Sequence, residues 1–252
     1  MANAKTQSCR WLIDARKVLY LLAIWVLSAT NIANADRRSY VWTYEYMTMP
    51  KGKSEIEYYL THKAPDFHKY SENNTWEHQI EYEYGLTDKW DVSIYQRWQQ
   101  TNTSEGDKFE YTGTKLRTRY RLGEKGMYPI DTLLYLEYIR PDSSKEAEII
   151  EGKLIFAKDF GKVNIAYNQI RKVVINNRGD NENEYASGVS YEFNPCLKLG
   201  LESTGSYTED EYYLGPTVSL ASKKFWVAVG ALRGLNDRSD DFRSRLIVGI
   251  PF

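Results

Sequence analysis

From Lys53 onward, hydrophobic and polar residues alternate along most of the chain with a period of two. The segment 75–85, TWEHQIEYEYG, is the clearest case, because Trp76, Ile80 and Tyr82 alternate with glutamates and a glutamine. Side chains of a β-strand point alternately to its two faces, so this pattern predicts strands with one apolar and one polar face. Twelve such strands are predicted, at 55–63, 75–85, 90–100, 109–122, 130–140, 147–158, 162–174, 183–193, 196–206, 211–221, 223–233 and 241–252.

Two kinds of connection alternate between the predicted strands. Tight ones lie at 86–89, 123–129, 159–162, 194–196 and 222–224, and generally longer, polar ones lie at 64–74, 101–108, 141–146, 176–182, 208–210 and 236–241. Tilted strands of about ten residues cross a bilayer, whereas strands of a soluble sandwich usually have about 5 or 6 residues. Short turns on one side and longer loops on the other are typical of a transmembrane barrel. A secreted β-sandwich or a soluble lipocalin-like barrel remains the alternative.

The polar faces of these strands carry many charges. Lys115, Arg117, Arg119 and Arg121 share one face of the segment 109–122. Each cation would cost roughly 2–4 kcal/mol if it pointed into the middle of the bilayer, so this face is predicted to point into a wet interior. The same argument predicts a set of charges that line the lumen or pore: Glu55, Glu57, Glu77, Glu81, Glu83, Arg97, Lys115, Arg117, Arg119, Arg121, Arg243 and Arg245.

The last predicted strand, DFRSRLIVGIPF, separates its residues in the same way. Leu246, Val248, Ile250 and Phe252 lie on one face, and two arginines lie on the other. A final strand that ends in Phe with this spacing resembles the C-terminal insertion signal of bacterial outer-membrane β-barrels. The resemblance implies an all-β, antiparallel, up-and-down transmembrane barrel of about 12 strands, similar to small porins. It also implies outer-membrane lipid and the barrel-insertion machinery as partners.

The first 35 residues have the order of a secretory signal peptide. Arg10, Arg16 and Lys17 precede an apolar run at 18–30, and the small residues Ala33 and Ala35 flank Asn34. A basic region, about 7–15 apolar residues and a small-x-small site form the signature of a cleaved signal, so we expect cleavage after Ala35. The run is shorter than the roughly 20 residues of a membrane-spanning helix. We therefore expect export to the outer membrane of a Gram-negative bacterium.

Composition agrees with a barrel and excludes other classes. The charges of residues 1–35 sum to +3, so their removal changes the net charge from −1 to −4, and nothing indicates nucleic-acid binding. Only Cys196 remains after residue 35, so no internal disulfide is expected. The mean hydropathy of −0.59 argues against membrane helices. The 21 tyrosines and 7 tryptophans suit a protein whose rings lie at both bilayer interfaces.

Residues 36–52 precede the predicted barrel of residues 53–252. The segment 40–49, YVWTYEYMTM, also alternates and is followed by Pro50, Lys51 and Gly52. Three interpretations remain open: an additional strand, an arm folded into the lumen, or a periplasmic extension. A barrel of 13 or 14 strands would follow from the first.

Three functions fit a barrel with a charged lumen. The first is a small passive channel for ions or small solutes, in which changing Arg117, Arg119 and Arg121 to Gln is expected to shift selectivity toward cations. The second is a closed barrel whose opposed charges form interstrand salt bridges. Barrels of 8 strands are filled by side chains and barrels of 16 to 18 strands enclose open channels, so 12 strands do not decide between these two.

The third function is a lipid-acting enzyme, which would need a nucleophile next to a base. His62, His68 and His78 are the histidines of the chain, and no GxSxG-like stretch lies beside them. A cluster of His78 with Ser71 or Asn74 is the remaining possibility. No cofactor is expected, and the grouping of His62, His68 and Asp66 lacks the fixed spacing of a metal site.

Overall fold

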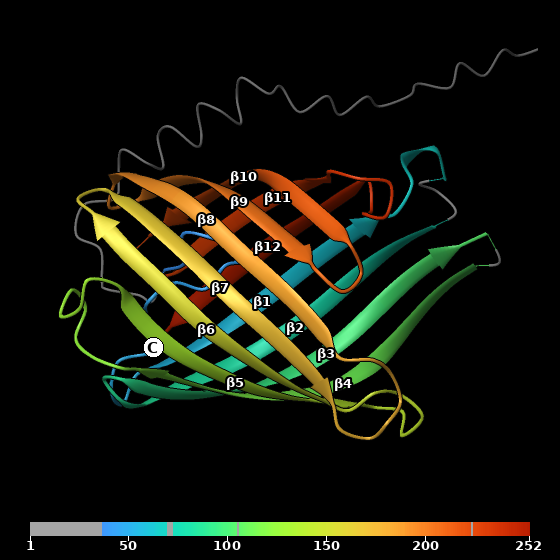
Figure 1. The fold of residues 1–252 in the computed structure, drawn as a ribbon, viewed down its shortest axis with the longest axis horizontal. Helices are drawn as coiled ribbons and strands as arrows, with labels where there is room; N and C mark the ends of the chain where they lie inside the picture. The colour runs from blue at the N-terminus through green and yellow to red at the C-terminus, as the bar shows by residue number, and fades with distance from the viewer. Residues whose placement is uncertain (1–36, 70–72, 105, 223) are drawn as a thin grey trace, which may run out of the picture. The chain divides into compact units, whose positions relative to one another are not determined.

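The computed structural model describes residues 37–69, 73–104, 106–222 and 224–252. Within them, twelve antiparallel strands close into one barrel, in which each strand pairs with its neighbours in sequence and β1 pairs with β12 (Figure 1). The predicted fold class is therefore confirmed. The strands are β1 (Ser54–Ala64), β2 (Asn73–Thr87), β3 (Trp90–Thr103), β4 (Gly106–Arg121), β5 (Asp131–Pro141), β6 (Ile149–Phe160), β7 (Val163–Val174), β8 (Glu182–Asn194), β9 (Leu197–Ser206), β10 (Glu211–Ala221), β11 (Trp226–Gly234) and β12 (Phe242–Pro251), with a 3₁₀ helix η1 (Phe67–Lys69) between β1 and β2.

The seam between β1 and β12 follows from the alternation of both strands. Ile56 lies opposite Ile250, and Tyr58 lies opposite Val248, so apolar side chains face outward on both sides of the seam. The ladder continues over ten residue pairs and leaves no unpaired strand edge there. Closure of this kind satisfies the backbone N–H and C=O groups of edge strands, which a bilayer cannot do.

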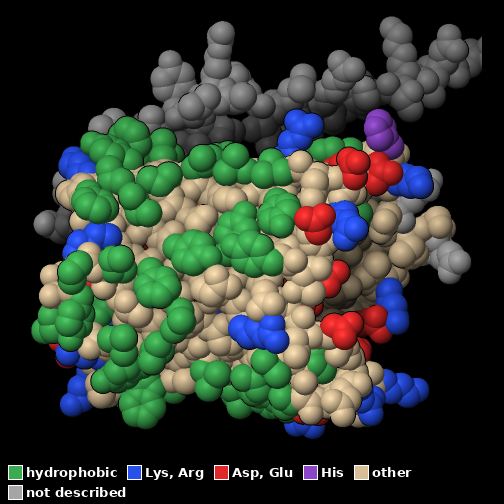
Figure 2. All heavy atoms as spheres, in the orientation of Figure 1, with side chains coloured by type: hydrophobic (Ala, Val, Ile, Leu, Met, Phe, Trp, Pro, Cys, Tyr) green, Lys and Arg blue, Asp and Glu red, His purple; other side chains and the backbone are tan. Residues whose placement is uncertain are grey.

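The outer surface is apolar between two ends. Leu136, Leu154 and Ile165 are among the outward side chains that are more than 40% exposed. Figure 2 shows hydrophobic side chains spread over the face in view, with acidic side chains gathered toward the right-hand end. Exposed aromatic rings lie near both ends of the barrel. Tyr84 is near the end of β2, beside a short turn, and Phe109 is near the start of β4, on the side of the longer loops, as expected for the two interfaces of a bilayer. None of the described helices has the length and apolar composition needed to span a membrane.

The hairpin of β3 and β4 differs from the prediction. Residues 101–108 were expected to form a longer polar loop, but the ladder continues through Thr101 and Lys108 to the pair Thr103 and Gly106. The two strands therefore extend beyond their neighbours toward the right of Figure 1. The prediction failed because backbone pairing does not require an apolar face, and polar residues can continue a hairpin in water.

Residues 37–50, which we call the arm, form no strand and lie inside the barrel. Their side chains take part in two buried clusters with inward residues of the wall. Tyr40 and Tyr46 pack with Leu133 and Ile155, and Val41 packs with Trp226. The core of this molecule is therefore the contact between the arm and the inner wall.

Candidate functional site

The arm is held by side chains that bind its backbone. One carboxylate, that of Glu202 on β9, accepts hydrogen bonds from the backbone N–H groups of Val41, Trp42 and Thr43, at 3.0, 3.0 and 2.8 Å. Asn168 on β7 accepts one from the N–H of Tyr44 at 2.7 Å and donates one to its carbonyl at 2.9 Å. Because a coil inside a barrel has no ladder partner, these side chains supply the bonds that buried backbone groups require.

Further anchors lie near the end of the barrel that carries the short turns. The N–H of Met49 donates to Asp91 at 2.9 Å. The hydroxyl of Tyr46 donates to the carbonyl of Gly123 at 2.7 Å, and that of Tyr40 donates to the carbonyl of Asn164 at 2.9 Å. Gly123 lies two residues after the end of β4, and Asn164 is the second residue of β7, so the arm occupies the half of the lumen next to these turns, which we call the turn half.

Two glycines make room for the arm. A Cβ atom on Gly188 of β8 would lie 2.4 Å from the ring of Tyr40, and one on Gly230 of β11 would lie 2.4 Å from Val41. Any side chain at either position would therefore displace the arm or the wall. Ala228, two residues before Gly230 on β11, faces the lumen as well, since it is fully buried in the same cluster as Val41.

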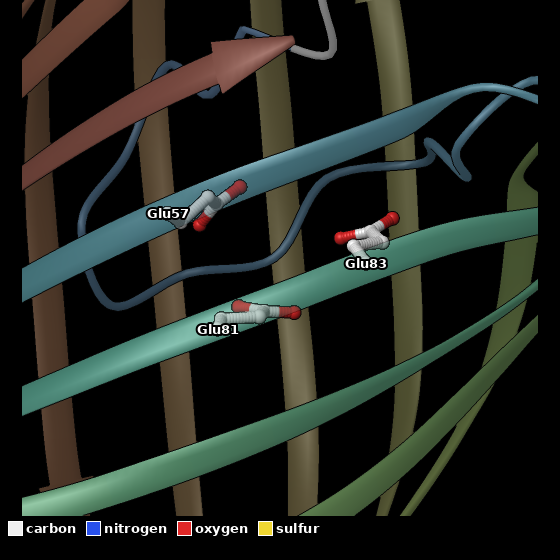
Figure 3. A group of neighbouring side chains, drawn as sticks. All are labelled: Glu57, Glu81 and Glu83. Atoms are coloured by element: carbon white, nitrogen blue, oxygen red, sulfur yellow. The ribbon is translucent and has the colours of Figure 1, made fainter. Parts of the chain in front are cut away.

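Three carboxylates on β1 and β2 lie together beside the arm (Figure 3). Oxygens of Glu57, Glu81 and Glu83 lie within 4.8 Å of one another, which is close enough for a shared cation. The barrel register explains the cluster, since Glu57 lies directly opposite Glu81 and Glu55 lies directly opposite Glu83. Like charges in directly opposed positions repel each other, so this arrangement needs compensating cations.

Arginines of β4 provide the compensation by reaching across β3. Arg117 contacts Glu81 at 2.8 Å and Glu83 at 2.6 Å, and Arg119 contacts Glu83 and also Asp91, the latter at 2.7 Å. The small Ser93 lies between Glu83 and Arg117 in the ladder and leaves this path open.

From the arm, Arg38 approaches Glu57 at 3.9 Å. Each of the three carboxylates therefore has a guanidinium within 4 Å, and we call this set of residues (Arg38, Glu57, Glu81, Glu83, Asp91, Arg117 and Arg119) the buried ion network.

Beyond the arm, toward the longer loops, the lumen contains a cavity of about 240 Å³. Its floor is formed by Arg38, Trp42 and Tyr44 of the arm, and its wall by inward residues of the strands. Four of its cations pair with carboxylates: Lys115 with Glu137 at 3.0 Å, Lys153 with Glu151 at 3.0 Å, Lys172 with Glu184 at 2.7 Å, and Arg243 with Glu211 at 2.9 Å. The lining of the cavity is thus highly polar.

The floor of the cavity is electropositive. The guanidinium of Arg38 lies 4.3 Å from the centre of the Tyr44 ring, and the ammonium of Lys153 lies 4.8 Å from it. The surroundings of Tyr44 therefore favour negative charge.

The other residues predicted to line the lumen occupy several environments. Glu55 accepts a hydrogen bond from the Trp226 indole at 2.9 Å, and Glu77 pairs with Lys63 at 2.6 Å. Arg97 donates to the carbonyl of Thr112 at 3.0 Å, and Arg121 donates to the carbonyl of Asp88. Arg243 and Arg245 line the cavity, whereas Arg117, Arg119 and Arg121 do not. A residue that the sequence pattern places on the inner face of the barrel therefore does not necessarily line the cavity.

The remaining predicted positions lie outside the lumen. Leu246, Val248, Ile250 and Phe252 alternate with the inward residues of β12, and Phe252 is 61% exposed. The predicted cleavage residues Ala33 and Ala35 lie outside the described residues.

The histidines on β1 and β2 are in contact with aromatic residues. The Nδ1 atom of His78 lies 2.7 Å from the hydroxyl of Tyr58, and the ring of His62 lies 4.3 Å from that of Trp76. Of the two suggested partners of His78, Ser71 is outside the described residues, and the side-chain oxygen of Asn74 accepts a hydrogen bond from Asn102 at 2.8 Å. The hydroxyl found at the ring of His78 is thus a phenol, and the described residues give it no serine partner.

Several residues of the site were not among the lumen charges predicted from the sequence. Among them are Glu137, Lys153 and Lys172, which line the cavity, and Arg38, which comes from the arm. The strand residues were accessible to prediction, since they occupy the same alternate positions as their inward neighbours. No pattern signal indicates Arg38, because its place depends on how the arm folds into the barrel.

Comparison with known proteins supports the fold. No family model and no curated protein sequence matches the chain. Among solved structures, a KdgM porin is similar at 13% identity over 79% of this chain and 99% of that chain, with a TM-score of 0.56. A structure titled "KdgM porin in complex with disordered oligogalacturonate" is similar at 11% identity over 79% and 98% of the two chains, with a TM-score of 0.54. The outer membrane phospholipase A from Escherichia coli is less similar, at 10% identity over 81% and 97% of the two chains, with a TM-score of 0.45.

At these identities the likeness concerns architecture alone. The closed twelve-stranded barrel, its apolar outer face and its similarity to the KdgM porins agree with one another. The chain has the fold of a porin-like outer-membrane β-barrel.

Proposed function

We propose that this protein is a narrow passive channel for small hydrophilic solutes in the bacterial outer membrane, to which the signal of residues 1–35 directs it. The observation that carries the proposal is the polar cavity of about 240 Å³ inside the barrel. A lumen that had only to stabilise the fold would be filled by side chains, as in barrels of 8 strands. Here the half of the lumen next to the longer loops, which we call the loop half, contains this cavity and is lined by charged groups.

The comparisons are compatible with this function. A porin of the same fold is described in complex with oligogalacturonate, a hydrophilic and acidic sugar chain, so the architecture is compatible with a polar solute. The arm fills the turn half, and a solute that crosses the barrel has to pass it. We therefore expect a smaller conductance than that of a porin with an unobstructed lumen.

Reconstitution into planar bilayers tests the proposal. We expect discrete conductance steps from the refolded protein, and efflux of a small sugar such as glucose, but not of a dextran, from vesicles that contain it. Protein refolded in parallel and then heat-denatured is the control. A folded, inserted protein that produces neither steps nor efflux would contradict the channel.

A closed structural barrel is the second candidate, and one observation favours it. The arm and the buried ion network together occupy the turn half. Such a barrel would produce no conductance steps in planar bilayers, and vesicles that contain it would retain glucose. A lipid-acting enzyme is the third candidate and would release fatty acid from phospholipid vesicles, although the contacts of His78 with Tyr58 give it no support.

A further inference from the structure

Both ends of the arm lie at the end of the barrel that carries the short turns. The side chain of Arg37 donates to the carbonyl of Pro195, in the turn between β8 and β9. The backbone N–H of Lys51, which follows the arm, donates to Asp88 in the turn between β2 and β3, at 3.0 Å. Between these ends the chain reaches the floor of the cavity with Trp42 and turns back. The arm is therefore a loop that enters the lumen from the turn end and does not pass through to the other end.

Internal hydrogen bonds give the arm a shape of its own. The backbone N–H and the hydroxyl of Ser39 donate to the carboxylate of Glu45, at 2.5 and 2.6 Å. The N–H of Met47 donates to the carbonyl of Glu45 at 3.0 Å. Residues 37–50 belong to no strand, so their removal from the lumen would leave every strand ladder of the barrel intact. Withdrawal of the arm would thus break its contacts with the wall and preserve both the loop and the barrel.

The two residues that join the arm to β1 are suited to act as a hinge. Lys51 and Gly52 are both exposed, and Gly52 has a φ of +73°, a conformation that glycine adopts at little cost. A Cβ atom at Gly52 would meet no atom within 4 Å, so no packed side chain restricts rotation there. The N–H of Gly52 donates to the carbonyl of Gly85 at 2.8 Å, which keeps the start of β1 in place. The arm can therefore turn about these residues while the barrel stays closed.

The wall behind the arm is rich in small residues. Six of them lie in the buried clusters that hold the arm or directly against it: Ala157, Ala166, Gly188, Ala221, Ala228 and Gly230. Such side chains fill little of the space that the arm would leave, so the wall does not close over it. The buried ion network, by contrast, lies mainly on β1 to β4. Withdrawal of the arm would therefore open the lumen along β6 to β11, from the cavity to the turn end.

We propose that the arm is a gate, which withdraws through the turn end by rotation about Lys51 and Gly52 and so widens the lumen. This inference rests on the proposed channel and gives it two states, a narrow one with the arm seated and a wide one with the arm withdrawn. Residues 37–50 contain two arginines and one glutamate, a net charge of +1. A voltage across the membrane therefore acts on the arm, and a negative potential on the turn side favours withdrawal.

Single-channel recording at potentials of both signs tests the gate. We expect two conductance levels that interconvert, with the larger level favoured at one polarity only. One charge that crosses the whole field changes such an equilibrium about 50-fold per 100 mV, so a partial crossing should change it roughly 5- to 50-fold. Arg37→Gln removes the net charge of the arm and should abolish most of this voltage dependence. Lys224→Gln, at an exposed position of the turn between β10 and β11, is the control and should retain it.

A disulfide between the arm and the wall locks the gate. Val41 and Gly230 suit it, because a Cβ atom on Gly230 would lie 2.4 Å from Val41. In a Cys196→Ser background, oxidised Val41→Cys/Gly230→Cys should show the smaller level alone, and reduction should restore switching. Ala186→Cys/Thr204→Cys is the matched control, since this pair joins opposed positions of β8 and β9 and leaves the arm free. Loss of free thiols verifies that each disulfide has formed. Switching that persists in the oxidised lock, or a wild type with one level at both polarities, would overturn the gate.

Thiol labelling in detergent detects movement of the arm without any ion current, and it separates this proposal from the proposed function. Thr43 is fully buried, so Thr43→Cys in the Cys196→Ser background should react with a maleimide on a long polyethylene glycol chain only while the arm is withdrawn. Lys51→Cys, exposed at the hinge, is the fast-reacting reference. If Thr43→Cys reacts but bilayers show no conductance, then the channel fails and the withdrawal stands. If conductance is present but Lys51→Cys alone reacts, then the channel stands and the gate fails. Native migration on unheated gels verifies that each variant is folded.

Discussion

The two halves of the lumen use the same kinds of residue for different purposes. In the turn half, the side chain of Arg117 is 1% exposed and contacts Glu81 and Glu83. In the loop half, Lys115 of the same strand is 18% exposed and faces the cavity beside Glu137. Both cations follow from one alternating pattern on β4, two residues apart, yet one is part of a buried ion network and the other lines a solute-sized space.

The arm accounts for this difference. The ring of Tyr44 lies 5.8 Å from the guanidinium groups of Arg117 and Arg119, and Met49 binds Asp91. Water is thereby excluded from the turn half, where ions must pair within the protein. Beyond the arm, the same wall borders the cavity. Charge on the inward face of a barrel therefore indicates a wet pore only where nothing else occupies the lumen.

The largest expected effect comes from breaking the buried ion network. Arg117→Ala leaves Glu81 and Glu83 buried near Glu57 without their main cation, and removal of one partner from a buried ion pair costs about 3–5 kcal/mol. Urea unfolding in lipid vesicles measures the loss. Arg140→Ala, at an exposed outward position, is the control and should stay within about 0.5 kcal/mol of wild type. Equal stability of the two variants would mean that the network contributes little.

A smaller effect is expected from loosening the arm. Glu202→Ala removes the acceptor of three buried backbone N–H groups, and each such bond to a charged group contributes about 1.5–3 kcal/mol when nothing replaces it. Because the arm can move and regain water, we expect a loss of about 2 kcal/mol, faster amide exchange at residues 41–43 and a larger conductance. Glu202→Gln keeps one acceptor oxygen, so its stability and its amide exchange rate should lie between those of the wild type and Glu202→Ala. Unchanged exchange in Glu202→Ala would contradict the role of this carboxylate.

The smallest effect concerns the space left by glycine. A methyl group at Gly188 would meet the ring of Tyr40, and overpacking of this kind costs about 1–3 kcal/mol, part of which is relieved if the arm shifts. Gly152→Ala is the matched control, because a Cβ atom there meets no atom within 4 Å. Thermal unfolding in detergent compares the variants. If Gly152→Ala and Gly188→Ala melt at the same temperature, then the packing of Tyr40 against β8 is not tight.

The sequence by itself determined the two faces of the wall and the twelve strands after residue 52, but it left a further strand at residues 40–49 open. Residues such as Glu81 and Ile80 are assigned to opposite faces because side chains alternate along a strand and a bilayer accepts only apolar groups. The extension of β3 and β4 past residue 100 escaped prediction, since the polar residues there pair through their backbones and leave no hydrophobic pattern.

Only the tertiary structure decided what fills the lumen. The alternation of residues 40–49 is compatible with a strand, an arm or an extension, because local pattern does not specify the partner of a backbone. In this protein the backbone of the arm is hydrogen-bonded by Glu202 and Asn168, which are far away in the chain. Their side chains supply the acceptors and donors that a neighbouring strand would otherwise provide. Which inward charges are buried in pairs and which face the cavity depends in turn on where the arm lies, so the candidate site could not be derived from the strands alone.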